Sequence, residues 1–198
     1  KMIGLLISDI ENSFYSTIAK NVEAIAKKHG YHVVLCNSND DPEEELRYLN
    51  LLDMMQVEGL IITPTAYNRL KLEEMQNRGI AIVQIDRQVE NLQADAILVD
   101  NESGTETVVN HLIQAGHTRI GILSGSIDVT TGKLRLAGYA RALENNGIEY
   151  QANLVKTSSF RRDHAIEDVR ELLNETPPPT AIFAANNILA EACIWVFN

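Results

Sequence analysis

The chain has 198 residues, 45% of them hydrophobic, and a formal net charge of −10. This length allows one large domain or two small ones. The evenly spread apolar residues exclude a disordered chain, and no apolar run approaches the roughly 18–20 residues of a membrane-spanning helix. Proteins that grip nucleic-acid phosphates over a broad surface are usually basic, so this acidic chain does not itself favour DNA binding.

Short apolar runs alternate with longer helical patterns along the first half of the chain. Ile18, Val22 and Ile25 recur at three- and four-residue spacing, which predicts a helix that ends at Gly30. Pro42 opens another helix, whose first turn carries three glutamates that suit the positive end of the helix dipole. The predicted strands cover residues 2–7, 31–36, 59–63, 80–85 and 96–99, and the predicted helices cover 14–29, a segment from 42 onwards and 70–78.

The same alternation repeats after residue 100. Strands that alternate with helices of ten or more residues indicate parallel sheets with helices on both faces. The first run ends in a strand without its following helix, so we predict an α/β fold of two flavodoxin-like lobes, residues 1–99 and 100–198. The predicted strands of the second lobe cover residues 120–123, 154–156 and 180–184, and its predicted helices cover 102–115, 134–146, 164–173 and 188–196.

Candidate binding residues follow the ends of these strands, because ligands of open parallel sheets bind beyond the carboxyl ends of the strands. These positions are rich in Asn, Asp and Arg, and they include the aromatic residues Phe14, Tyr15 and Phe160. Carboxylates accept hydrogen bonds from sugar hydroxyls, guanidinium groups donate to two neighbouring oxygens, and aromatic rings pack against the C–H faces of sugars. The strand ends therefore favour a sugar-binding site. The segments are 8–15, 86–87, 124–131 with Arg135 on the following helix, 157–160 and 186–187.

Each of these candidates also has a purely structural interpretation. An aromatic residue anchors a helix, an exposed ion pair contributes little, and an asparagine before a helix caps it. Their shared position at strand ends, rather than any single residue, supports the binding hypothesis. The structural alternatives are anchoring of the first helix by Phe14 and Tyr15, a surface ion pair of Asp86 with Arg87, a surface pair of Arg135 with an acid, and capping of the last helix by Asn186 and Asn187.

Catalytic and metal sites find less support. Ser124-Gly125-Ser126 lacks the nucleophile-elbow pattern. Asp9, Glu11 and Asp86 would supply a glycosidase pair, but 27 acidic residues provide such combinations by chance. The glycines form neither a dinucleotide-binding nor a phosphate-binding loop, and the histidines lack zinc-ligand spacing. We therefore expect no enzyme activity, no cofactor and no metal.

Several segments, in a fixed order along the chain, carry a family pattern. They include Asn12-Ser13-Phe14-Tyr15, Val57-Glu58-Gly59-Leu60-Ile61-Ile62, Ile85-Asp86-Arg87, Gly116-His117-Thr118-Arg119-Ile120, Arg135-Leu136-Ala137-Gly138-Tyr139 and Pro179-Thr180-Ala181-Ile182-Phe183-Ala184-Ala185-Asn186. Over the whole chain they resemble LacI/GalR transcription repressors and periplasmic sugar-binding proteins. Ser13 stands where the family commonly has proline, and Asn187 where it generally has Asp. The segments 116–120 and 179–186 favour a repressor.

The resemblance implies a ligand pocket between the two lobes. The matching positions are most similar to ribose-binding members, so ribose, or a similar pentose or hexose, is the expected small-molecule effector. The matching pocket residues are Ser8, Asn12, Phe14, Tyr15, Asp86, Arg87, Thr131, Arg135, Phe160 and Asn186.

The resemblance also implies partners and a mechanism. The sugar would stabilise a closed arrangement of the lobes and thereby change how a homodimer presents its DNA-binding headpieces to the operator. The headpiece and the end of the second lobe would lie outside these residues, so we expect exposed apolar surface on this chain. Cys36 and Cys193 lie in apolar contexts, which fits a reducing compartment, and a repressor would be cytoplasmic. The lack of a long apolar run leads us to expect no membrane partner. The alternative is the sugar-binding component of an ABC transporter, which a signal peptide in place of the headpiece would indicate.

Overall fold

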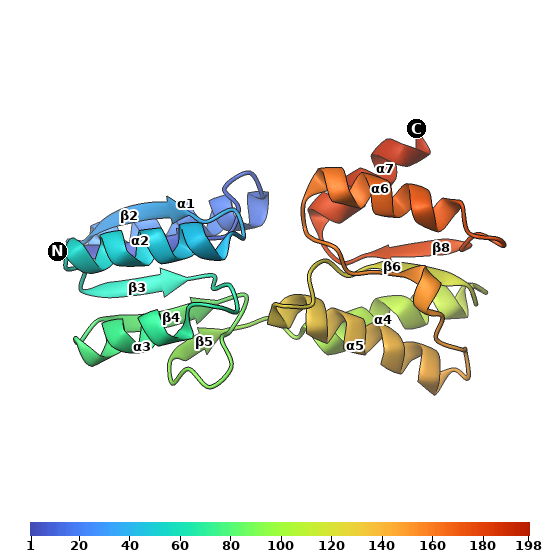
Figure 1. Cartoon of the computed structure of the whole chain (residues 1–198), viewed down its shortest axis with the longest axis horizontal. Helices are drawn as coiled ribbons and strands as arrows, with labels where there is room; N and C mark the ends of the chain where they lie inside the picture. Colours follow the sequence, from blue (N-terminus) through green and yellow to red (C-terminus); the bar gives the residue numbers. More distant parts are fainter. The chain divides into compact units, whose positions relative to one another are not determined.

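The computed structural model describes residues 1–198, which divide into two compact units. Lys1–Val99 form the N-terminal unit and Asp100–Asn198 form the C-terminal unit. Strands and helices alternate in both units, and all paired strands are parallel (Figure 1). The predicted α/β class with parallel sheets is confirmed.

The N-terminal unit contains a five-stranded sheet in the order β2-β1-β3-β4-β5. This is the strand order of flavodoxin-like folds, in which ligands bind beside the first strand at the carboxyl edge. Its elements are β1 (Met2–Ile7), α1 (Ser13–Lys28), β2 (His32–Asn37), α2 (Pro42–Met54), β3 (Gly59–Ile62), α3 (Arg69–Asn77), β4 (Ala81–Ile85) and β5 (Asp95–Ile97).

Side chains that alternate along the strands build two cores, one on each face of this sheet. Leu6 packs with Leu52 of α2 and Leu72 of α3, whereas its neighbour Leu5 packs with Tyr15 of α1. Helices α2 and α3 therefore cover one face and α1 covers the other (Figure 1). This double burial explains why the strands read as continuous apolar runs rather than as an alternating pattern.

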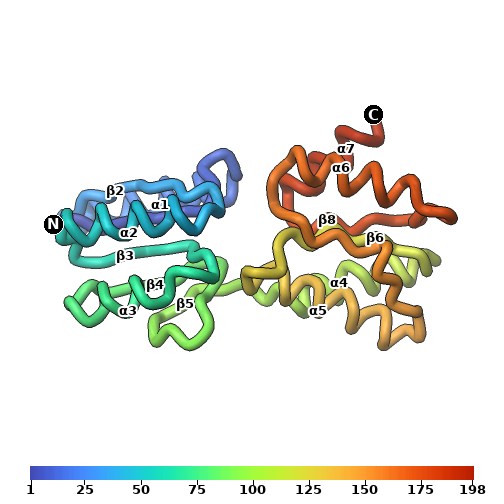
Figure 2. Tube along the Cα trace, viewed as in Figure 1, coloured from blue at the N-terminus to red at the C-terminus, as the bar shows by residue number.

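The C-terminal unit contains a three-stranded sheet in the order β7-β6-β8. One buried cluster joins β6 to α4 and α5, and a second joins the sheet to α6 and α7. Figure 2 shows the course of these helices beside the sheet. Gly138 lets α5 lie close against α4, because a Cβ at this position would overlap with the carbonyl oxygen of Glu102. The elements are α4 (Asn101–Gln114), β6 (Ile120–Leu123), α5 (Thr130–Asn145), a short 3-10 helix (Ala152–Leu154), β7 (Val155–Lys156), α6 (Arg162–Leu173), β8 (Ala181–Ala184) and α7 (Asn187–Phe197).

The largest difference from the predicted elements is the start of α5, which begins at Thr130 rather than at residue 134. Its N-cap residue, Val129, provides no side-chain hydrogen bond, and Gly132 in the first turn is a weak helix former. The usual sequence signals of a helix start are therefore missing. As a result Thr131, which we expected in a loop, lies in the first turn of the helix.

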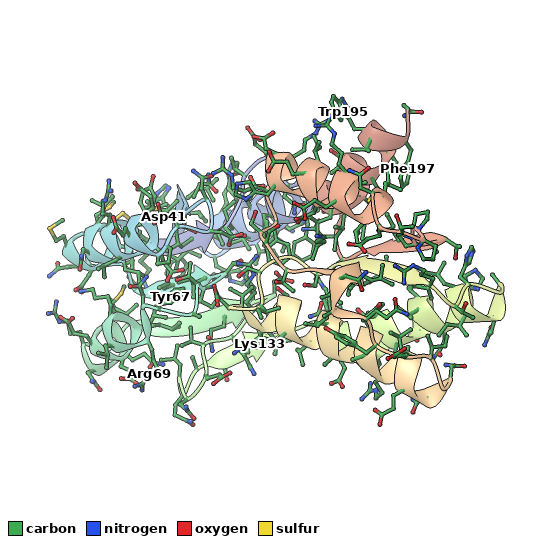
Figure 3. All side chains as sticks on the ribbon, turned by 45° about the vertical axis from the view of Figure 1, so that its right-hand side comes forward. Asp41, Tyr67, Arg69, Lys133, Trp195 and Phe197 are labelled. Carbon is green, nitrogen blue, oxygen red and sulfur yellow. The ribbon has the colours of Figure 1, made fainter.

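Apolar side chains are exposed in both units. Ile97 of β5 is 69% exposed, and Trp195 and Phe197 of α7 are 52% and 59% exposed (Figure 3). The predicted exposure of apolar surface is therefore present. No helix of the structure has the length and apolar character needed to cross a membrane.

Candidate functional site

The carboxyl edge of the N-terminal sheet joins three of the predicted site residues. Asp86 and Arg87 follow β4, and Tyr15 lies in the first turns of α1. The Tyr15 hydroxyl donates a hydrogen bond to Oδ2 of Asp86 at 2.8 Å, across 71 positions of sequence. Tyr15 is buried and anchors α1 to the core, which agrees with its purely structural interpretation. Its hydroxyl also holds the Asp86 carboxylate at the carboxyl edge of the sheet.

Asp86 adopts a backbone conformation that few non-glycine residues accept, with φ +65°. Such a conformation costs on the order of 1–3 kcal/mol and persists only where the surroundings impose it. The Asp86 N–H donates to the carbonyl oxygen of Ile97 at 2.9 Å, which ties this turn to the end of β5. Burial raises the pKa of the Tyr15 hydroxyl, so Tyr15 acts as a neutral donor to Asp86.

Arg87 is buried, with only 5% of its side chain exposed, so the interpretation of Asp86 and Arg87 as a surface ion pair is wrong. Its guanidinium donates through Nη1 and Nη2 to the two carboxylate oxygens of Asp40. Its Nε lies 3.8 Å from Oδ2 of Asp86. Burial alone would lower the pKa of Arg87, but Asp40, Tyr15 and Asp86 outweigh this effect, and the pKa is raised. Arg87 therefore remains charged.

Asp40 is a residue of this edge that the sequence analysis missed. It lies in the loop between β2 and α2, and its N–H donates to the carbonyl oxygen of Ser8 at 3.1 Å. The signal was available, because β2 lies beside β1 in the sheet and its carboxyl end meets the same edge. Residues that follow β2 therefore reach this edge just as those that follow β1 do.

The remaining predicted residues of the N-terminal unit follow β1. Asn12 is the N-cap of α1, and its Oδ1 accepts a hydrogen bond from the Phe14 N–H at 3.0 Å. Phe14 is 42% exposed and packs edge-to-face against Tyr15, with ring centroids 5.1 Å apart. Ser8 is buried directly after the strand. Phe14 thus presents an aromatic ring at this edge, while Asn12 shapes the start of the helix beneath it.

In the C-terminal unit, α5 carries two predicted site residues at the carboxyl end of β6. Nε of Arg135 donates to Oδ1 of Asn101 on α4 at 2.8 Å, so an amide of the neighbouring helix orients this guanidinium. Thr131 is buried in the first turn of α5. Both side chains are therefore positioned by the packing of α5 against α4.

Phe160 and Asn186 follow β7 and β8 in the same sheet. The ring of Phe160 packs against the backbone of Gly125, which has φ +71°. A Cβ at this position would overlap with the ring carbons. Oδ1 of Asn186 accepts a hydrogen bond from the Leu189 N–H at 2.8 Å, so the capping interpretation of Asn186 is confirmed. The cap uses only the amide oxygen of Asn186. The Nδ2 group of the same side chain, which is a hydrogen-bond donor, takes no part in the cap.

These edges define a class of protein, namely the effector domains that resemble type I periplasmic binding proteins. The family model of periplasmic binding proteins and the sugar binding domain of the LacI family matches residues 1–197. The chain belongs to this family.

The relatives are transcription regulators. The chain is 32% identical over 196 residues to the HTH-type transcriptional regulator DegA of Bacillus subtilis, covering 98% of this chain and 58% of DegA. It is 34% identical over 189 residues to a ribose operon repressor of Halalkalibacterium halodurans, covering 96% of this chain and 55% of that protein. The chain thus spans little more than half the length of these relatives.

Solved structures agree on the fold. A protein from Burkholderia thailandensis that is described as a ribose operon repressor superposes with a TM-score of 0.86 at 31% identity, covering all of this chain and 73% of the other. The transcriptional regulator CelR, solved in complex with cellobiose, superposes with a TM-score of 0.85 at 28% identity, covering 99% of this chain and 62% of CelR.

Proposed function

We propose that this chain is the effector-binding part of a LacI-type transcriptional repressor and that its effector is a small sugar, ribose or a similar pentose or hexose. The observation that carries this proposal is the Tyr15–Asp86–Arg87 arrangement at the carboxyl edge of the N-terminal sheet. It offers a fixed carboxylate and a charged guanidinium to vicinal hydroxyls. The family and the ribose operon repressors among the relatives support the same class of ligand.

In this proposal the sugar contacts residues of both units. The N-terminal unit contributes polar groups and an aromatic ring, and the C-terminal unit contributes Arg135, Thr131, Phe160 and Nδ2 of Asn186. A ligand that contacts both units binds more tightly to the closed arrangement, in which both contacts are made, than to an open one. This difference in affinity shifts the equilibrium towards the closed arrangement. In the cytoplasm, a homodimer of the full-length protein binds DNA through residues outside this chain. Sugar binding and DNA binding are coupled because both depend on how the two subunits are arranged.

Calorimetric titration of the full-length protein with D-ribose, other pentoses and hexoses tests the proposal. We expect one sugar to bind with measurable heat and to change the affinity for operator DNA in a fluorescence anisotropy assay. Sedimentation of the same sample should give a dimer. The proposal fails if none of the sugars produces heat or changes operator affinity.

A further inference from the structure

The carboxyl edge of the N-terminal sheet carries more negative than positive charge around its buried arginine. Arg87 contributes one positive charge, whereas Asp40 and Asp86 contribute two negative charges that both lie within ion-pair distance of its guanidinium. Little solvent screens the charges of Arg87 and Asp86, whose side chains are 5% and 9% exposed, whereas the side chain of Asp40 is 34% exposed at the rim of the edge. This arrangement gives a net negative environment around Arg87, at the edge where the proposed function places the sugar.

Asp40 accepts one hydrogen bond from each of the two terminal nitrogens of Arg87. Nη1 donates to Oδ1 of Asp40 and Nη2 donates to Oδ2 at 3.3 Å, a two-point contact that sets the plane of the guanidinium. The same fork geometry is what binds a phosphate group. A phosphorylated ligand would therefore have to compete with Asp40 for these donors.

The backbone holds Asp40 in place independently of Arg87. Asn39 and Asp40 both have positive φ angles, +53° and +57°, and the Asp40 N–H donates to Ser8 at the end of β1. The next residue, Asp41, is the N-cap of α2, where its Oδ1 accepts from Glu43 N–H at 2.8 Å (Figure 3). The backbone of Asp40 is thus held between β1 and the start of α2.

We propose that Asp40 is a specificity-determining positioning residue, which orients Arg87 and cancels its charge so that the site selects an uncharged sugar over the corresponding sugar phosphate. This inference rests on the proposed function and specifies the class of its ligand. A neutral sugar needs an oriented polar group and an accepting carboxylate, which Arg87 and Asp86 supply. A sugar phosphate brings about two negative charges to an edge that already has an excess of them.

Calorimetry of the full-length protein with two pairs of probes tests the inference: D-ribose with D-ribose 5-phosphate, and D-glucose with D-glucose 6-phosphate. We expect the wild type to bind the neutral member of a pair at least tenfold more tightly than its phosphate. Asp40→Asn, which removes the charge and one of the two acceptors, should reduce this ratio about tenfold. Glu23→Gln is the matched control, since it removes an exposed acid of α1 that lies outside the candidate binding segments and has no contact with Arg87, and its ratio should equal that of the wild type.

The outcomes separate the two proposals. If neither these probes nor the other pentoses and hexoses bind to the wild type, the sugar-binding function itself is contradicted. If the wild type binds a sugar phosphate as tightly as the free sugar, or more tightly, the role of Asp40 is overturned while sugar binding stands. An unchanged ratio in folded Asp40→Asn, checked by near-UV circular dichroism, overturns it too. Asp40→Glu keeps the charge and displaces the carboxylate, so it should weaken sugar binding and retain the preference for the neutral sugar. The wild-type ratio decides the question even if a variant fails to fold.

Discussion

The two units place their predicted site residues at the same edge of similar sheets, but they hold these residues in different ways. In the N-terminal unit, Asp86 contacts both Tyr15 and Arg87. In the C-terminal unit each residue is tied to its own scaffold: Arg135 to Asn101, Phe160 to Gly125 and Asn186 to the first turn of α7.

The two units also differ in where they bury charged side chains. The charged residues among the fully buried ones are Glu45 and Arg87, and both belong to the N-terminal unit. Buried charges need partners, so a network forms around them, and its members should respond together to substitution. The effects of substitutions at Arg135, Phe160 and Asn186 in the C-terminal unit should instead be additive. The variants below test this contrast, from the largest expected effect to the smallest.

Gly125→Ala should have the largest effect, because it disturbs the backbone on which Phe160 rests. The new Cβ overlaps with the ring, and the alanine must adopt a positive φ. We therefore expect the free energy of unfolding to fall by about 2–4 kcal/mol in urea titrations. Gly147→Ala is the matched control, since Gly147 has φ +66° but no atom within 4 Å of a Cβ. It should lose only about 1–2 kcal/mol. Equal losses would show that Phe160 does not press on Gly125.

Tyr15→Phe should remove the hydrogen bond that links α1 to Asp86. Because the bond is buried and its acceptor is charged, the expected loss is about 1.5–3 kcal/mol of unfolding free energy. Tyr31→Phe removes a similar Tyr–carboxylate bond, 3.0 Å to Glu58, at an exposed position, and should cost less than about 1 kcal/mol. In a double-mutant cycle, Tyr15→Phe and Asp86→Asn should not be additive. Additive losses would contradict the network.

Glu45 offers a pH test of the charge buried in the N-terminal unit. Its carboxylate accepts hydrogen bonds from the Thr65 N–H at 2.6 Å and from Nδ2 of Asn68 at 2.9 Å. Burial nevertheless raises the pKa of Glu45 above its ordinary value of 4.5. The folded state therefore binds the proton more tightly than the unfolded state, and the stabilisation from the protonated form is present below pH 4.5 and lost as the pH rises through the raised value.

Glu45→Gln keeps the shape, does not titrate and replaces one acceptor by a donor. At pH 4.5 the variant should be less stable than the wild type by about 1–3 kcal/mol. This gap should narrow as the pH rises to 8, because only the wild type then carries a buried charge. Chemical denaturation at a series of pH values measures the gap. A gap that is constant, or that widens with pH, would refute the raised pKa.

The sheets could be predicted from the sequence because both faces are buried. Continuous apolar runs such as 2–7 and 120–123 have one interpretation once they alternate with long helices. The start of α5 could not be predicted in the same way, because Val129 and Gly132 are unusual at a helix start and the tertiary contacts of α5 with α4 override their preferences.

The candidate site was predictable in position but not in connectivity. Strand ends identify which residues reach the carboxyl edge, so Tyr15, Asp86 and Arg87 were found. Which of them touch depends on strand order and on backbone conformations such as the positive φ of Asp86 and Asp40, and a single sequence encodes neither in a local pattern. This is why Asp40, which is adjacent in space to Arg87 but 47 residues away in sequence, escaped prediction.

Asn186 should show the smallest effect on stability and separates its cap from its proposed role in binding. Asn186→Ala removes the hydrogen bond to the Leu189 N–H and should cost about 1 kcal/mol. Asn186→Asp keeps a good capping oxygen, so its unfolding free energy should stay within about 0.5 kcal/mol of the wild type, but it replaces the Nδ2 donor by an acceptor. If Nδ2 donates to the sugar, Asn186→Asp should bind D-ribose at least tenfold more weakly in calorimetry although its stability is unchanged. If sugar affinity instead follows stability, falling in Asn186→Ala and not in Asn186→Asp, then Asn186 acts only as a cap.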